Sequence, residues 1–212
     1  MECSVSYESN LNGRILFALK KSGFENADIP SPNPEDLPES KIQSIIAGVR
    51  LYYRQERERY LPASALLSKD LKSAAQGYFP EAVLDRVKTV TLKGARIPTP
   101  HFYEEAKAMS SGRFPDFTHI ASFTYIDVLV FHEEIERRPL FHALIHATQI
   151  GSLGFEKYVE LYVRGFVKYR SWIAIPLEAQ AYQLDARIAA CGSQVFSIED
   201  EVQRWIKEGL YS

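Results

Sequence analysis

The period of the hydrophobic pattern changes twice along the chain, and this feature constrains the fold most strongly. In residues 39–60, isoleucine, valine and tyrosine residues recur at the three- and four-residue spacing of one helix face. Residues 84–92 end in alternating β-branched residues, and residues 120–133 contain two strand-like runs around Tyr125–Asp127. From Arg137 onward the pattern is helical again. The order of helices, a small sheet and further helices predicts an α+β fold that is predominantly helical.

The remaining elements follow from prolines, glycines and periodicity. Residues 11–22 can form a short amphipathic helix, and four prolines in residues 28–38 indicate an extended connector. Further helices are predicted at residues 64–77, 101–111, 139–151, 154–168, 176–190 and 197–208. We expect an N-terminal helical extension over residues 1–80 and a second unit over residues 81–212, although the two can form one compact unit.

Composition and charge exclude several classes of protein. Hydrophobic residues make up 46% and charged residues 25% of the 212-residue chain, which is typical of a globular protein. A net charge of -2 argues against a nucleic-acid partner. No apolar run approaches the roughly 18 residues that span a bilayer, so no membrane partner is expected. The first residues lack a secretory signal pattern, and a cytoplasmic location is the expectation. Cys3 and Cys191 lack the spacing of a cysteine metal site.

Two histidines four residues apart are the strongest chemical feature of the sequence. His142 and His146 belong to the segment FHALIHATQ, and a helix would place them one turn apart on one face. A tetrahedral zinc ion accepts such a pair with bonds of about 2.0–2.1 Å. Gln149 follows at the next turn and is a candidate hydrogen-bond donor to a ligand. From spacing alone, a metal site and a pair of packed core histidines are about equally supported.

A third ligand is needed, and Glu178 is the leading candidate. It lies in the segment IPLEAQAY among apolar neighbours, and burying a carboxylate without a partner is costly. The partner is either a metal ion or an arginine such as Arg170 or Arg187. The other candidate ligands in the sequence are His119, His132, Glu133, Glu134, Glu136, Glu156 and Glu160.

With these pieces in order, residues 84–190 resemble the zincin metallopeptidases of the gluzincin branch, in particular small bacterial domains. In that group, a helix reading HELxHxxQ follows a short strand pair, and a later helix has proline and an apolar residue before its glutamate. The segments ASFTYIDVLVFHE, FHALIHATQI and IPLEAQAY match this order. The resemblance implies a zinc ion held by His142, His146 and Glu178, with a peptide or protein as substrate. It also implies that Asp127–Phe131 pairs with an extended peptide, unless this segment is an inner strand.

The chain departs from the resembled motif at Ala143. The family has a glutamate there, which activates the attacking water and passes a proton to the leaving amine. Removing a general base typically costs about 10²–10⁴-fold in rate, so we expect a zinc-loaded and nearly inactive protein. Either the protein is a natural pseudopeptidase, or alanine was introduced into an active peptidase. The intact motif elsewhere favours the introduced substitution, and alanine would leave the helix undisturbed.

Two side chains near Glu178 are further candidates. Tyr182 is one turn later and could stabilise the oxyanion of the reaction, although a core tyrosine is the favoured interpretation. Asp185 could orient a metal-bound histidine, but a surface charge paired with Arg187 or Lys168 is preferred.

Two other functions remain open at this point. The chain could be an interaction module that retains a structural zinc, closed by a fourth protein ligand such as His132 or Glu136. It could also be a non-haem iron protein, because two histidines and one carboxylate form the facial triad of such proteins.

Overall fold

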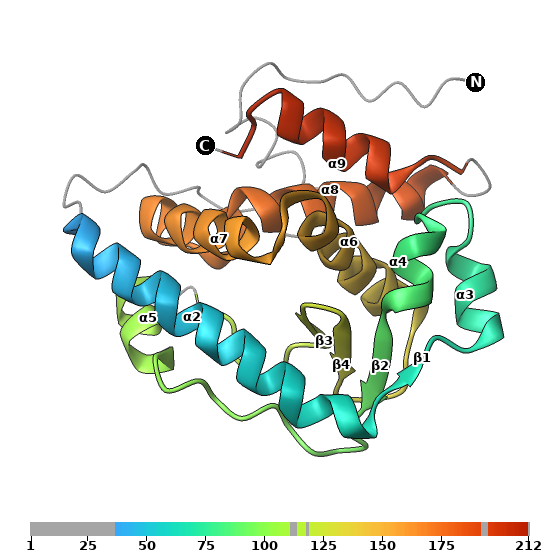
Figure 1. Ribbon diagram of the computed structural model, residues 1–212, viewed down its shortest axis with the longest axis horizontal. Helices are drawn as coiled ribbons and strands as arrows, with labels where there is room; N and C mark the ends of the chain where they lie inside the picture. The colour runs from blue at the N-terminus through green and yellow to red at the C-terminus, as the bar shows by residue number, and fades with distance from the viewer. Residues whose placement is uncertain (1–36, 111–113, 118, 192–194, 212) are drawn as a thin grey trace.

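In the computed structural model, a small mixed sheet is combined with helices from both halves of the chain (Figure 1). The structure describes residues 37–211 apart from 111–113, 118 and 192–194. The helix predicted at residues 11–22 and most of the proline-rich connector lie outside the described residues. The α-helices are α2 (Glu39–Tyr60), α3 (Lys69–Ala75), α4 (Glu81–Arg86), α5 (Tyr103–Met109), α6 (Arg137–Leu153), α7 (Phe155–Tyr169), α8 (Pro176–Cys191) and α9 (Ile198–Lys207). The predicted α+β class is confirmed.

The sheet has the strand order β1-β2-β4-β3. Its strands are β1 (Ala65–Leu66), β2 (Lys88–Thr91), β3 (Ser122–Tyr125) and β4 (Val128–Phe131). β2 and β4 are parallel, whereas the β1–β2 and β3–β4 pairs are antiparallel. β4 is therefore an inner strand whose main-chain groups are hydrogen-bonded on both sides. The expectation that Asp127–Phe131 pairs with an extended peptide is wrong for this reason.

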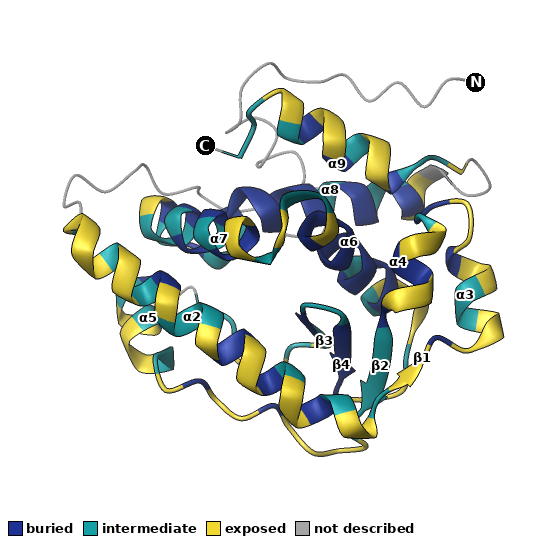
Figure 2. Cartoon of the chain, viewed as in Figure 1, coloured by how far each residue is buried: buried dark blue, intermediate teal, exposed yellow. Residues whose placement is uncertain are grey.

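Helix α2 packs against the rest of the molecule along one apolar face. It contacts α7 and the β3–β4 hairpin, and buried and exposed residues alternate along it (Figure 2). Tyr52 and Tyr53 are each 6% exposed and make edge-to-face contacts with Tyr125 of β3. Arg57 forms an ion pair with Asp127 in the hairpin turn, with Nη2 3.0 Å from Oδ2. The first long helix thus shares one apolar core with residues from the second half of the chain.

One predicted boundary is wrong in the region before the sheet, and one helix there was not predicted. The helix expected over residues 64–77 begins only at Lys69, because the Ser68 side chain accepts a hydrogen bond from the Leu71 amide and caps α3. Strand β1 occupies part of the expected helix. The alternating residues at the end of 84–92 form β2, which begins at Lys88, and the short helix α4 (Glu81–Arg86) after Pro80 was not predicted. Among the described residues, no helix combines the length and apolarity needed to cross a membrane.

The contact of α7 with the start of α8 depends on a glycine. A Cβ atom at Gly165 would lie 2.9 Å from Pro176 Cδ and 3.2 Å from Ile175 Cγ2. We expect Gly165→Ala to lower the free energy of unfolding by about 1–3 kcal/mol, because the start of α8 must move to relieve the overlap. Denaturant unfolding would measure this loss.

Gly48→Ala in α2 is the matched control for this change. No atom lies within 4 Å of a Cβ at Gly48, so alanine there should raise helix stability by about 0.5–1 kcal/mol. Equal stability losses in the two variants would contradict the tight α7–α8 contact.

Candidate metal centre

Helix α6 places its two histidines side by side within the core. Residues 143–150 are all buried, so the helix is surrounded by protein over two turns. His142 Nε2 and His146 Nε2 lie 3.1 Å apart, and their rings are edge-to-face. The side chain of His146 is 8% exposed and that of His142 is 18% exposed. The pair is therefore reached from solvent on the His142 side.

Helix α8 supplies the carboxylate. The helix begins at Pro176, a residue suited to the first helical position because its missing N–H needs no partner there. Glu178 lies in this first turn and is 4% exposed. Its Oε2 atom lies 3.6 Å from His142 Nε2 and 3.4 Å from His146 Nε2. Two helices that are separate in sequence thus bring three potential ligand atoms together.

The spacing of these three atoms fits a metal ion. Tetrahedral bonds of about 2.0–2.1 Å, as zinc makes with histidine, place neighbouring ligand atoms about 3.3–3.4 Å apart. The observed separations of 3.1, 3.4 and 3.6 Å lie on both sides of this value. Glu178 Oε2 is also buried without a hydrogen-bond partner, which is costly for a carboxylate that has no cation beside it. The cluster of His142, His146 and Glu178 could therefore hold a metal ion.

The carboxylate and the imidazoles of the cluster each stabilise the charged form of the other. Burial by itself would raise the pKa of Glu178, but the two imidazoles hold that pKa well below its usual range. Burial by itself would lower the pKa of His146, but the Glu178 carboxylate raises it above the ordinary value. The site thus favours a charged carboxylate and attracts a positive charge to the histidines, either a proton or a metal ion.

Gln149 holds His146 in the orientation that a ligand needs. His146 Nδ1 donates to Gln149 Oε1 at 2.9 Å, which leaves Nε2 free to bind a metal. The Gln149 amide in turn donates to Leu177 O and Gln180 Oε1 on α8. Gln149 does lie beside His146, but the expected donor role is wrong, because Gln149 accepts the histidine proton and donates only to α8.

We expect Gln149→Leu to weaken metal binding by about 10–100-fold, because the imidazole loses the partner that fixes its tautomer and ring orientation. Competition with a chromogenic chelator would measure the affinity. Thr148→Val is the matched control, since the Thr148 hydroxyl is buried but bonds only to Leu144 O within α6. An unchanged metal affinity in Gln149→Leu would show that this hydrogen bond does not orient the ligand.

A second chain of hydrogen bonds reaches the carboxylate from the other side. Trp172 Nε1 donates to Tyr162 Oη at 2.7 Å, and Tyr162 Oη donates to Glu178 Oε1 at 2.8 Å. Tyr158 Oη also lies 3.3 Å from His146 Nδ1. Sequence reasoning missed the two tyrosines of α7, although their four-residue spacing places both on one helix face, as it does for the histidines.

Ala143 is fully enclosed. Its residue exposure is 1%, and it belongs to an apolar cluster that includes Phe141 and Leu144. Its carbonyl oxygen accepts a hydrogen bond from Thr124 Oγ1 of β3 at 3.2 Å. The Cβ atom of a glutamate at this position would therefore lie in the apolar core, on the side of α6 that adjoins the sheet.

The other candidate ligands lie elsewhere among the described residues. No fourth histidine, cysteine, aspartate or glutamate joins the cluster within the described part of the chain. His132 is buried, but its Nε2 accepts the Ile97 N–H at 3.1 Å. Glu136 is exposed. The acidic candidates Glu133, Glu156 and Glu160 form ion pairs with arginines.

The two candidates on α8 have different surroundings. The Tyr182 ring packs against the His142 ring with centroids 4.7 Å apart, and burial raises the pKa of its phenol. Its role in stabilising an oxyanion stays a prediction. Asp185 is paired with Arg138 of α6 at 2.8 Å, so the expected pairing with Arg187 or Lys168 is wrong. Arg187 instead pairs with Glu201 at 2.9 Å.

Comparisons with known proteins add no family to this description. No protein-family model, no curated protein and no solved structure matches the chain.

Proposed function

We propose that this chain is a zinc protein of the metallopeptidase type, in which peptide-bond hydrolysis is nearly lost because Ala143 replaces the general base. One observation supports the metal centre most directly. Three ligand atoms from His142, His146 and Glu178 lie 3.1–3.6 Å apart, and no fourth protein ligand joins them among the described residues. Three protein ligands and one open position are typical of catalytic zinc, whereas structural zinc has four protein ligands.

Each residue of such a site would have a separate role. Bound zinc would act as a Lewis acid for a peptide carbonyl and would make water more acidic. The two histidines would hold the ion through Nε2, and the Glu178 carboxylate would contribute the negative charge. Gln149 and Tyr162 orient one histidine and the carboxylate by hydrogen bonds. The chain offers no carboxylate at position 143 to accept a proton from the attacking water, and this is why we expect little turnover.

Metal analysis of the purified chain tests this proposal. We expect one zinc per chain after dialysis against an equimolar mixture of zinc and ferrous ions, and its removal by a chelator. Zinc binding should also raise the melting temperature, because a ligand that binds only the folded state stabilises it. Preferential loading with iron would favour the facial-triad alternative, and failure to bind either metal would refute a metal site.

A second candidate function is a non-enzymatic interaction module that retains the zinc. The burial of Ala143 at 1% exposure favours it, because the position now serves the packing of α6. A small hydroxamate separates the two candidates, since it binds zinc only where a coordination position is open. Binding to the zinc-loaded chain supports the peptidase-type site, and its absence supports a closed structural site.

A further inference from the structure

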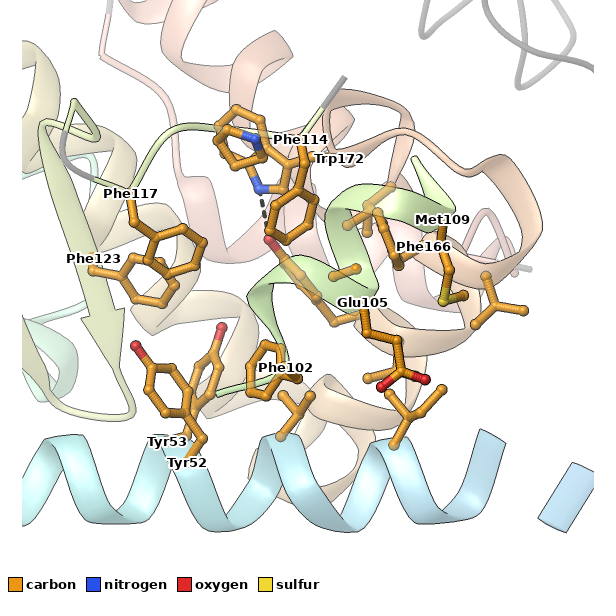
Figure 3. A pocket seen from close by; sticks show the side chains of 18 of the residues that line it. Tyr52, Tyr53, Phe102, Glu105, Met109, Phe114, Phe117, Phe123, Phe166 and Trp172 are labelled. Carbon is orange, nitrogen blue, oxygen red and sulfur yellow. Dashed lines mark hydrogen bonds between the residues drawn. The ribbon is translucent and has the colours of Figure 1, made fainter. Parts of the chain in front are cut away.

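An apolar cavity lies next to the metal centre, between α2, α5 and α7. Its volume is about 100 Å³, and Figure 3 shows that its wall is built largely from aromatic rings. Nine of the lining side chains are aromatic, so a bound molecule would meet ring faces and edges in most directions. Tyr52, Phe102 and Trp172 come from three different segments of the chain and all line the same space.

The cavity carries no charge that a ligand could use. Glu105 is its only charged lining residue, and its carboxylate already pairs with Lys41 Nζ at 2.9 Å, with both side chains about half exposed. The hydroxyl of Tyr52 is hydrogen-bonded to the Tyr125 hydroxyl at 3.0 Å. A charged ligand would lose its hydration without compensation in this space, so the chemistry favours a neutral one.

The size of the cavity restricts the ligand further. An apolar cavity of about 150 Å³ lined by aliphatic and aromatic side chains binds benzene. The cavity of this chain is smaller, about 100 Å³, so it has room for no more than one ring. Aromatic rings gain about 0.5–1.5 kcal/mol from edge-to-face and offset-stacked contacts beyond the area that they bury. We propose that this cavity is a binding site for a small neutral molecule with a single aromatic ring.

Two side chains that line the cavity connect it to the metal cluster. Tyr162 and Trp172 line the cavity, and they form the hydrogen-bond chain that ends on Glu178 Oε1. A ring packed against them restrains the Tyr162 hydroxyl in the position where it donates to the carboxylate. Ligand and metal therefore affect each other's affinity by the same factor, and we expect a change of about fivefold or more.

Calorimetric titration with toluene tests the cavity itself. The full chain should bind toluene saturably, whereas benzoate and benzylamine, which carry the same ring with a charge, should not bind. Ala106→Phe places a ring in the cavity from α5 and should weaken toluene binding about tenfold or more. Ala108→Phe on the exposed face of the same helix is the matched control and should leave binding unchanged. Absence of toluene binding, or equal binding to both variants, would overturn the proposal.

The link to the metal has a separate measurement. Zinc affinity is compared with and without saturating toluene in the native chain and in Tyr162→Phe, which retains the ring but loses the hydroxyl. We expect toluene to change zinc affinity in the native chain and not in the variant. An unchanged affinity in the native chain would refute the coupling. Toluene should still bind to Glu178→Gln, so failure of the metal proposal and failure of the cavity proposal are distinguishable.

Discussion

Glu178→Gln is expected to abolish stoichiometric metal binding while leaving the fold intact. Glutamine has the same shape and keeps an oxygen for the Tyr162 hydroxyl, but it removes the only negative charge of the cluster. Loss of a hydrogen-bond partner of a ligand costs about 10–100-fold in metal affinity, so loss of a ligand itself should cost more than about 100-fold. Metal content after gel filtration and the rise in melting temperature on adding zinc are the two measurements.

The same measurements on His142→Ala should give the same result, because that variant removes a nitrogen ligand. Glu160→Gln is the matched control, since Glu160 is a carboxylate on α7 that pairs with Arg164 and Lys157 outside the cluster. The control should bind one zinc like the native chain. Full zinc occupancy in both Glu178→Gln and His142→Ala would show that the zinc binds elsewhere in the chain.

The second large effect is expected from Ala143→Glu. If the chain is a peptidase that lacks only its base, this change should raise chelator-sensitive cleavage of a mixed peptide library by about 10²–10⁴-fold. Without zinc, the variant should be less stable than the native chain, because the new carboxylate starts from a position that is 1% exposed. Zinc should restore part of that stability by neutralising the carboxylate.

Ala143→Gln is the matched control for Ala143→Glu, since glutamine has the same size but cannot accept the proton. It should stay inactive. A folded and zinc-loaded Ala143→Glu variant that cleaves no peptide would favour the pseudopeptidase or interaction module over the peptidase with an introduced alanine. Measuring zinc content in each variant separates loss of the metal from lack of a base.

Local patterns predicted the long elements well. Helix α2 has the predicted limits Glu39–Tyr60, because apolar residues recur on one face from Ile42 to Tyr60 and a proline precedes the helix. The errors lie in residues 64–86, where short elements meet. A two-residue strand such as β1 is too short to show the alternation of apolar and polar residues that identifies a strand. Its pairing with β2 depends on contacts between segments far apart in sequence.

In the candidate site too, features within one helix were predicted and contacts between helices were not. The spacing of His142 and His146 within one helix predicted their proximity, and burial arguments selected Glu178. The partners that cross between helices were predicted incorrectly or not at all. Asp185 pairs with Arg138 of α6, and Tyr162 of α7 bonds to Glu178, although nothing in the local sequence specifies how α6 and α7 pack against α8.

The position of the ligands has a consequence for the chain as a polymer. His146 lies in the middle of α6 and Glu178 near the start of α8, so a bound ion would join two points on either side of the whole of α7. Such a link acts as a reversible cross-link that closes a loop and reduces the conformational freedom of the unfolded chain. If the chain were cut between α7 and α8, the bound ion would hold the two fragments together. A chelator would then separate them without any reducing agent.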